Sequence, residues 1–268
     1  MISLTRRSGV FSRATLALLA ILAAGPLFAA AADDALATIN IAGEQRMLSQ
    51  RIVKAYLQLG LNVQPLAAKT QLDSAIRRFE ANQQLLLPAI AGDPDSRRAG
   101  ELLTTAWEQM RPLTSGAPTL ENAQRLSAYG ETVLNAAEML VNVYADRSGV
   151  DEHRLLRLMA RQRMLSQRIA KTYLLRSWGD QSAQLRYQSE DAIIAFEGVL
   201  TMFQSRRDEG PMLRQELDEL ALQWEWMKAA LESDGALSYR LIVAESADAI
   251  LASADRLAQQ YQRLLAAR

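Results

Sequence analysis

The amino-acid sequence predicts an all-α protein of two tandem antiparallel four-helix-bundle modules after an N-terminal signal peptide. Of its 268 residues only 13 are Gly and 7 are Pro, and the abundant residues, such as Ala, Leu, Gln, Arg and Glu, favour helix. The Gly and Pro residues cluster at a few breaks between long helical stretches. The octapeptide Gln-Arg-Met-Leu-Ser-Gln-Arg-Ile also occurs twice, at 45–52 and at 162–169.

The two octapeptides are part of a longer internal repeat. The same offset of 117 residues, without a gap, aligns Phe-Glu at 79–80 with 196–197, Trp-Glu at 107–108 with 224–225, and Tyr144 with Tyr261. Because chance does not hold one register over such a length, we interpret the pattern as a tandem duplication. Packing alone would more readily preserve apolar size and spacing than identical polar residues, so the octapeptide is the first candidate for a functional segment.

Residues 1–32 have the features of an export signal. Three arginines precede an uncharged apolar stretch at 14–24, and small residues follow up to residue 32. Cleavage there places the mature protein in the periplasm without a further membrane span. The alternative is an uncleaved signal that anchors the protein in the inner membrane, because residues 14–32 carry no charge.

The composition excludes several classes of function. Without residues 1–32 the chain has 27 Lys and Arg against 30 Asp and Glu, a net charge of −3, which argues against nucleic acid as a partner. The absence of Cys excludes disulfides and thiolate metal sites. A single His without a Glu-x-x-His pair indicates no metal site, no cofactor and no catalytic triad, so we do not expect an enzyme.

Module 1, residues 33–148, divides into four predicted helices. Gly60 with Pro65, Gly92 with Pro94, and the Gly116 to Pro118 segment provide the breaks. Asp93 and Thr119 are suited to cap the third and fourth helices. The predicted helices are 35–61, 66–90, 95–113 and 119–146.

Module 2, residues 149–268, repeats this organisation. Breaks at 179–180, 210–211 and 233–235 separate helices predicted at 151–178, 181–206, 211–232 and 236–267. Short loops between four helices are typical of an up-down bundle. The junction at 147–150 is also short, so it either forms a hinge or lets the fourth helix continue almost directly into the fifth.

The helix that contains the octapeptide has two buried-type faces on a wheel of 100° per residue. The first face is an ordinary core stripe of Ile41, Gln45, Leu48, Ile52, Ala55 and Leu59. The second is also mostly apolar or small and comprises Ile39, Ala42, Gly43, Arg46, Gln50, Val53 and Leu57. Module 2 reproduces it with Leu156, Met159, Ala160, Arg163, Gln167, Ala170 and Leu174. We therefore expect each motif helix to lie between its own bundle and another helix.

Arg46 and Arg163 stand near the middle of these second faces, and a buried guanidinium needs a partner. Gly43 and Ala160, one turn earlier, allow close helix approach, so two facing helices can present both arginines to one small space. A flat oxyanion such as nitrate or a carboxylate suits the donor fork of Arg. Further hydrogen bonds can come from Ser49, Gln50, Ser166 and Gln167.

A second interpretation involves no ligand. Arg46 and Arg163 can instead pair with Glu or Asp of neighbouring helices. Basic side chains on the flank of each motif helix are expected to be solvated or salt-bridged; these are Arg51, Lys54, Arg168 and Lys171.

Residues 39–51, Ile-Asn-Ile-Ala-Gly-Glu-Gln-Arg-Met-Leu-Ser-Gln-Arg, resemble the signature of the PilJ-type domain, the N-terminal domain of type IV pili methyl-accepting chemotaxis transducers. They are also similar to the P-box of the NarX/NarQ nitrate and nitrite sensors. The second copy keeps Arg-Met-Leu-Ser-Gln-Arg at 163–168 but has Arg157, Met159 and Ala160 where the pattern has Asn, Ala and Gly. The resemblance implies a periplasmic four-helix bundle. It also implies anion binding at a helix–helix dimer contact through Arg46, near Gly43, with Arg163 as the second equivalent.

The resulting hypothesis is a secreted, non-catalytic ligand-binding protein of the sensor type. It would bind a small nitrate- or nitrite-like oxyanion through the repeated motif, between the repeats or in a homodimer, and a membrane receptor partner would relay the signal. The alternative is an envelope, type IV pilus or chemotaxis-associated helical interaction module that docks a protein partner without a small ligand.

Overall fold

The computed structural model describes residues 14–148, 153–206, 210–233 and 236–266, which form helices and short connections without strands. This confirms the all-α fold class. The helices are α1 (Ala14–Gly60), α2 (Pro65–Ala91), α3 (Pro94–Leu113), α4 (Leu120–Ser148), α5 (His153–Trp178), α6 (Ala183–Ser205), α7 (Pro211–Leu231) and α8 (Leu237–Ala266).

The described helix ends agree closely with the predicted breaks, except at the start of α1. That helix begins at Ala14 and not near residue 35, and so continues back into the predicted signal segment. Residues 1–13 of that segment lie outside the described residues, and the signal peptide remains a prediction. Within the described part of the chain, no helix combines the length and apolar character needed to cross a membrane.

The two capping predictions are confirmed. The Asp93 carboxylate accepts hydrogen bonds from the backbone N–H groups of Asp95 and Ser96 at the start of α3. The Thr119 hydroxyl accepts from the N–H of Asn122 at 3.2 Å, one turn into α4. Both side chains satisfy N–H groups that a helix leaves without an internal partner.

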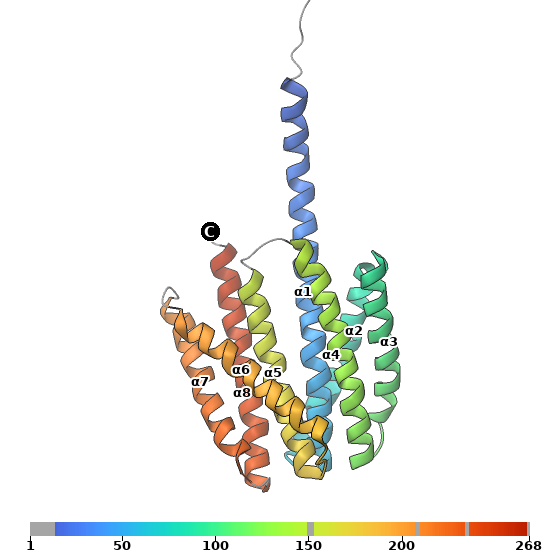
Figure 1. Ribbon diagram of the computed structural model, residues 1–268, viewed down its shortest axis with the longest axis vertical. Coiled ribbons are helices and arrows are strands. Elements are labelled where there is room, and N and C mark those ends of the chain that lie inside the picture. The colour runs from blue at the N-terminus through green and yellow to red at the C-terminus, as the bar shows by residue number, and fades with distance from the viewer. Residues whose placement is uncertain (1–13, 149–152, 207–209, 234–235, 267–268) are drawn as a thin grey trace, which may run out of the picture.

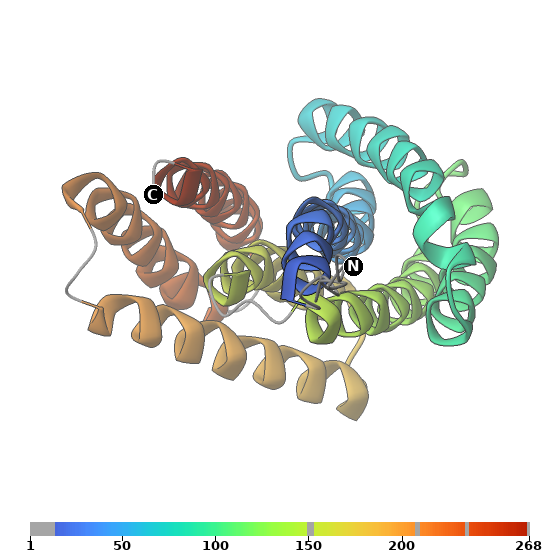
Figure 2. The same cartoon turned by 90° about the horizontal axis from the view of Figure 1, so that it is seen from above.

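Module 1 (α1–α4) and module 2 (α5–α8) lie side by side, and the two motif helices meet in the middle. Figure 2 shows α1 and α5 at the centre, with α2 and α3 on one side and α7 and α8 on the other. α1 packs against α2 and α4 of its own module and against α5 of the other. The prediction that the motif helix lies between its own bundle and another helix is therefore confirmed.

α1 and α5 run parallel. A β-carbon on Gly43 would lie 3.6 Å from the Cβ of Ala160, and Gly60, the last residue of α1, contacts Trp178, the last residue of α5. The contact between them therefore extends over roughly 25 Å at 1.5 Å per residue. The second face predicted for α1 contacts two different helices. Gly43 faces α5, whereas Val53 and Gln50 meet α4 at Gly130.

The two modules share a core but differ in their outer helices. Phe79 stacks on Trp107 with ring centroids 4.1 Å apart, and Phe196 contacts Trp224 at 4.5 Å. The outer helices of both modules contact each other little: α6 crosses its module diagonally (Figure 1) and contacts α7 only at a few residues. Contact between α2 and α3 in module 1 is also limited.

The contact between Gly60 and Trp178, at the C-terminal ends of α1 and α5, gives a test of this packing. A β-carbon on Gly60 would overlap the ring of Trp178, so we expect Gly60→Ala to lower the free energy of unfolding by about 1–3 kcal/mol, as overpacking does. Urea denaturation followed by Trp fluorescence measures this change. In a cycle with Trp178→Leu, the double variant should lose less than the sum of the single variants. A Gly60→Ala protein as stable as the wild type would contradict the contact.

Candidate functional site at the contact of the motif helices

Two repeated glutamines fix the motif helices to their own modules. The side-chain amide of Gln45 donates to the carbonyl of Phe79 at 3.1 Å, and that of Gln162 donates to the carbonyl of Phe196 at 3.1 Å. Both glutamines are buried. Sequence reasoning placed Gln45 on an ordinary core face and missed this role, although its recurrence at the same offset was a signal for it.

The polar residues expected to assist a ligand use their donors within the protein. The hydroxyls of Ser49 and Ser166 donate to the carbonyls of Arg46 and Arg163, one turn earlier, at 2.8 and 2.9 Å. The amide of Gln50 bonds to the carbonyl of Gly130 and to the Ser49 hydroxyl. Gln167 repeats this arrangement with Ala247 and Ser166. Gln50 and Gln167 therefore hold the motif helices against α4 and α8, and the two serines bond within their own helices.

The motif arginines each have a carboxylate partner within their own module. Arg46 is ion-paired with Glu138 of α4, and its side chain is only 4% exposed. Arg163 pairs with Asp255 of α8 at 2.7 Å and is 19% exposed. Glu138 and Asp255 are themselves related by the offset of 117 residues. Glu138 and Asp255 are therefore the acidic partners on neighbouring helices that the ligand-free interpretation of the sequence required.

Arg46 also lies close to the other motif helix. Its Nη2 would lie 3.5 Å from a β-carbon on Gly43, at the point where Gly43 faces Ala160. The Nε of Arg46 is buried and has no hydrogen-bond partner among the described residues. A β-carbon at Gly43 would make ordinary contacts, and Ala160 has one at the equivalent position, so close approach here requires a small residue and not specifically glycine.

Arg163, unlike Arg46, lines an open pocket between the modules. The pocket has a volume of about 260 Å³ and takes Asn40, Glu44 and Arg78 from module 1 and Arg163 and Asp255 from module 2. Its two arginines are balanced by its two carboxylates. Arg78 binds Glu44 with two hydrogen bonds of 2.9 Å. The structure therefore brings one motif arginine, together with the Asn and Glu of the other motif, to a solvent-accessible space.

Two lysines join the modules reciprocally. Lys54 of α1 contacts Asp248 of α8 at 2.6 Å, and Lys171 of α5 contacts Glu131 of α4 at 2.6 Å. Both lysine side chains are 0% exposed. The sequence left open whether these residues are solvated or salt-bridged, and the structure shows buried salt bridges. Arg168 also binds Glu131, at 2.6 Å, whereas Arg51 is 3.8 Å from Asp248.

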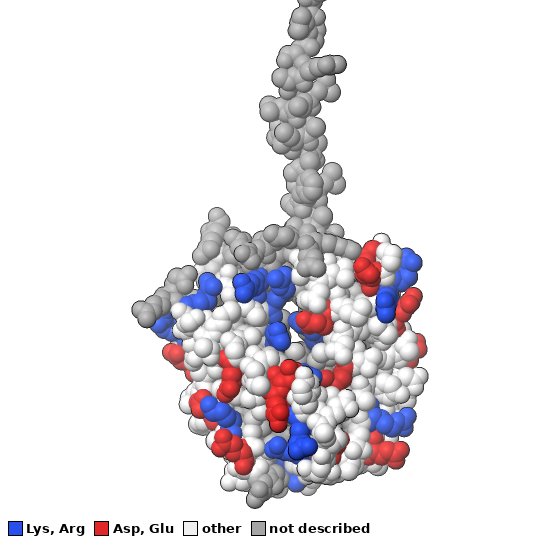
Figure 3. Space-filling model, viewed as in Figure 1, with Lys and Arg blue, Asp and Glu red and all other residues white. Residues whose placement is uncertain are grey.

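The acidic partners were not singled out from the sequence. Glu131 and Asp248 are related by the same offset as the lysines, which was an available signal. Only the packing of α1 beside α5 shows that each carboxylate serves the lysine of the other module. On the face in Figure 3, acidic and basic side chains are mixed along the middle, where the modules meet.

Burial and ion pairing have opposite effects on the pKa values of these lysines and carboxylates. Burial lowers the pKa values of Lys54 and Lys171 below the ordinary lysine value, and the facing carboxylates only partly offset this. Burial opposes ionisation of Glu131, but the charges and hydrogen bonds of Lys171 and Arg168 outweigh it and lower the pKa of Glu131 to about 2. Lys54, Arg51 and Gln71 lower the pKa of Asp248 in the same way.

Removing one of these carboxylates should destabilise the protein strongly. In Glu131→Gln the buried ammonium of Lys171 loses its counter-charge, so we expect a loss of about 3–5 kcal/mol in the free energy of unfolding. Urea denaturation measures this loss. Glu225→Gln is the matched control, because Glu225 forms an exposed pair with Lys228, and its effect should stay within about 0.5 kcal/mol. Equal effects of the two changes would contradict the buried pair.

The lowered carboxyl pKa values also predict acid sensitivity. Since the folded-state pKa of Glu131 lies below its ordinary value of 4.5, its contribution to stability is present above that value and is lost as the pH falls toward 2. We expect the Tm of the wild type to fall over this range, and the fall to be shallower in Glu131→Gln. The measurement is Tm against pH for both proteins. Parallel curves would show that Glu131 does not contribute.

The comparison with known families concerns module 1. Residues 28–132 match the PilJ family model, described as the type IV pili methyl-accepting chemotaxis transducer N-terminal domain. No curated protein and no solved structure matched the chain. The matched segment runs from α1 into α4 and includes Gly43, Arg46, Ser49 and Gln50. Residues 28–132 therefore match a PilJ-type domain, a helical sensory domain associated with chemotaxis and type IV pili transducers.

Proposed function

We propose that the protein is a periplasmic sensor-type protein. It binds a small planar oxyanion of the nitrate or nitrite type in the pocket between the modules. The observation that carries this proposal is the position of Arg163. It is the motif arginine that lines an accessible pocket, and the pocket is built from residues of both motif helices. Arg46 lies beside the same helix contact but is enclosed.

The guanidinium of Arg163 carries more N–H donors than its contact with Asp255 uses. Asp255 accepts from Nη1, and a guanidinium carries five N–H donors in a fixed plane. A flat oxyanion can accept two parallel hydrogen bonds from such a group. Asn40, whose side chain also lines the pocket, supplies a further N–H from the opposite motif helix.

Charge balance indicates how the anion enters. The pocket's two arginines are already matched by Glu44 and Asp255, so an anion has to compete with one carboxylate. Asp255 is the weaker competitor, because its side chain is 42% exposed and it accepts one hydrogen bond from Arg163, whereas Glu44 accepts two from Arg78. Displaced Asp255 can turn into solvent without leaving a buried charge.

An anion bound here would bias the relative position of the modules. Asn40 lies on α1 and Arg163 on α5, so a ligand that bonds to both favours one spacing of the parallel motif helices. A ligand shifts such an equilibrium only by its difference in affinity for the two arrangements. A membrane receptor partner in contact with both modules would respond to that change in their relative position.

A specific observation favours a second candidate. Both motif arginines already have carboxylate partners, Glu138 and Asp255, so the helix contact is satisfied without a ligand. In this case the protein is an envelope or pilus-associated interaction module that docks a protein partner, and the motif is structural.

A thermal-shift titration of the protein separates the two candidates. Nitrate, nitrite, sulfate, phosphate and acetate are compared at fixed ionic strength. We expect a saturable rise in Tm with nitrate or nitrite, corresponding to about 2.7 kcal/mol at 100 times the dissociation constant.

Arg163→Gln should remain folded and lose the response to the anion. Arg256→Gln, which removes a guanidinium of α8 that is 43% exposed and paired with Glu216, should keep the response. A flat titration of the folded wild-type protein would reject the anion site and leave the docking module as the remaining candidate.

A further inference from the structure

Three arginines form a row along the first turns of α5. Arg154, Arg157 and Arg161 are separated by three and four residues, a spacing that places them on one face of a helix. Arg154 and Arg161 are exposed and Arg157 is half-buried. At 1.5 Å per residue the row is about 10 Å long. Basic side chains gather at the upper middle of the face in Figure 3, where α5 begins. We call these three residues the arginine stripe.

Arg168, further along the same face of α5, shows which groups this face binds. It follows Arg161 by seven residues, or two turns, and so continues the row. Its guanidinium contacts Glu131 of α4 at 2.6 Å and Asp191 of α6 at 3.0 Å. At this level the row therefore lies between α4 and α6, and both flanking helices supply a carboxylate.

The arginine stripe has no such carboxylates, because α6 crosses its module diagonally and leaves this side of α5 (Figure 1). Seven residues after Asp191, α6 presents Gly198, where an added β-carbon would meet nothing within 4 Å. On the other flank, the carboxylate two turns beyond Glu131 of α4 is Glu138, which is already paired with Arg46. No arginine of the stripe forms an ion pair or hydrogen bond with a described residue.

Module 1 differs at the equivalent positions. The residues 117 positions before the stripe carry one negative charge in place of three positive charges. In module 1, α2 remains beside this face and its Arg78 donates two hydrogen bonds of 2.9 Å to Glu44. The equivalent of Arg78 on α6 is Ala195, so module 2 lacks a charged partner from this helix. The module 1 residues are Ala37, Asn40 and Glu44.

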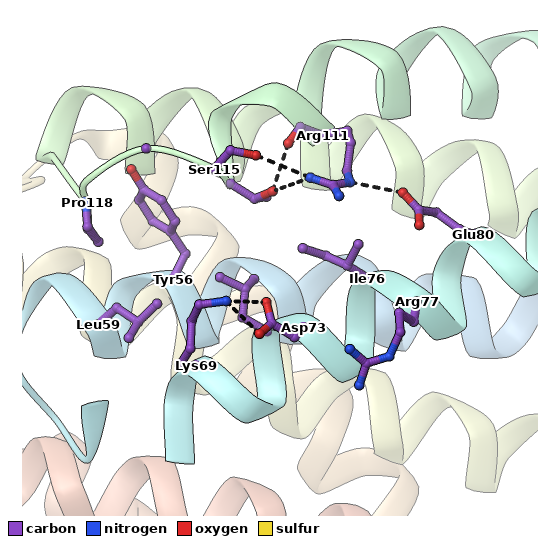
Figure 4. A pocket seen from close by; sticks show the side chains of 13 residues that line it. Tyr56, Leu59, Lys69, Asp73, Ile76, Arg77, Glu80, Arg111, Ser115 and Pro118 are labelled. Atoms are coloured by element: carbon purple, nitrogen blue, oxygen red, sulfur yellow. Dashed lines mark hydrogen bonds and ion pairs between the residues drawn. The ribbon is translucent and has the colours of Figure 1, made fainter. Parts of the chain in front are cut away.

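Three arginines in this arrangement repel one another. Like charges three and four residues apart on a helix are unfavourable, and the first turn of a helix already carries the positive end of its dipole. Cations elsewhere in the protein have carboxylates beside them. In the cavity of module 1 between α2 and the end of α3, Figure 4 shows Lys69 against Asp73 and Arg111 against Glu80. An acidic partner would provide the same compensation for the stripe.

We propose that the arginine stripe is a docking surface for an acidic helix of a partner protein. The helix lies along the start of α5, and its Glu or Asp side chains meet the stripe as Glu131 and Asp191 meet Arg168. Carboxylates spaced three and four residues apart on a helix match the stripe over its whole length. The surface lies outside residues 28–132. It is separate from the pocket at Arg163 and does not depend on anion binding there.

Fluorescence anisotropy with two labelled synthetic peptides tests this surface on the whole protein. Both peptides are Ala-rich and roughly 20 residues long, which is sufficient for helix formation in water. One carries Glu at alternating spacings of three and four residues, and the other carries Gln at the same positions. We expect saturable binding of the Glu peptide at low salt, weakening as salt screens the charges, and no binding of the Gln peptide. Absence of saturable binding, or equal binding of both peptides, would overturn the proposal.

The residues of module 1 supply the test variant. Arg154→Ala, Arg157→Asn and Arg161→Glu together copy module 1 and should weaken binding of the Glu peptide about tenfold or more, since three ion pairs are lost. Circular dichroism checks folding, and Arg161→Glu alone replaces the triple variant if that variant does not fold. Unchanged affinity in the folded variant would refute the assignment.

A control variant makes the same change of charge at another place. Arg97→Ala, Arg98→Asn and Arg125→Glu alter three exposed arginines of α3 and α4 and should leave peptide binding as in the wild type. An equal loss in the control would show general charge attraction and reject the stripe as a specific surface.

Two further measurements separate this surface from other sites and other occupants. Arg163→Gln should leave peptide binding intact, so failure here is distinguishable from failure of the anion site. Phosphatidylglycerol vesicles provide the membrane comparison. Vesicles that sediment the wild type but not the stripe variant, without binding of the Glu peptide, would assign the stripe to a membrane surface and overturn the partner helix.

Discussion

The parallel contact of α1 and α5 sets how the two modules meet, and two buried lysines fix its register. Lys54 and Lys171 are fully enclosed, and each reaches a carboxylate of the other module. An unpaired ammonium in such surroundings is costly. A slide of one helical turn, about 5.4 Å, would take both lysines from their partners at once. The register of the two modules therefore follows from a charge requirement as well as from shape.

This register divides the repeated motif into residues with different roles. The side-chain amides of Gln45, Gln50 and their equivalents donate to backbone carbonyls of adjacent helices, and the lysines join the modules. The arginines pair within their own modules and point toward the helix contact. Identity between the two octapeptides thus has a structural cause for most of its polar residues, and Arg163 also lines an accessible pocket.

The two modules have the same inner contacts but differ near the ends of the motif helices. The inner pairs recur with nearly equal distances, as in Lys54 to Asp248 and Lys171 to Glu131. Near the ends of the motif helices, Leu59 of α1 and Arg176 of α5 stand at equivalent positions, but Leu59 lines a pocket whereas Arg176 donates to the carbonyl of Leu231. Selection on the inner face is constrained by partners in both modules, but an outer cavity concerns one module alone.

The all-α class, the helix breaks, the caps at Asp93 and Thr119 and the position of the motif helix between its own bundle and another helix could all be predicted from the sequence. These features follow from local rules: helix periodicity, turn residues and capping geometry act within a few residues of the chain. The partners of Lys54, Lys171, Arg46 and Arg163 were decided only by the tertiary structure. Each lies between 40 and 194 residues away in the chain, and no local pattern selects one carboxylate among 30 acidic residues. The burial of the lysines and the accessibility of Arg163 arise for the same reason, because both depend on which helices surround α1 and α5.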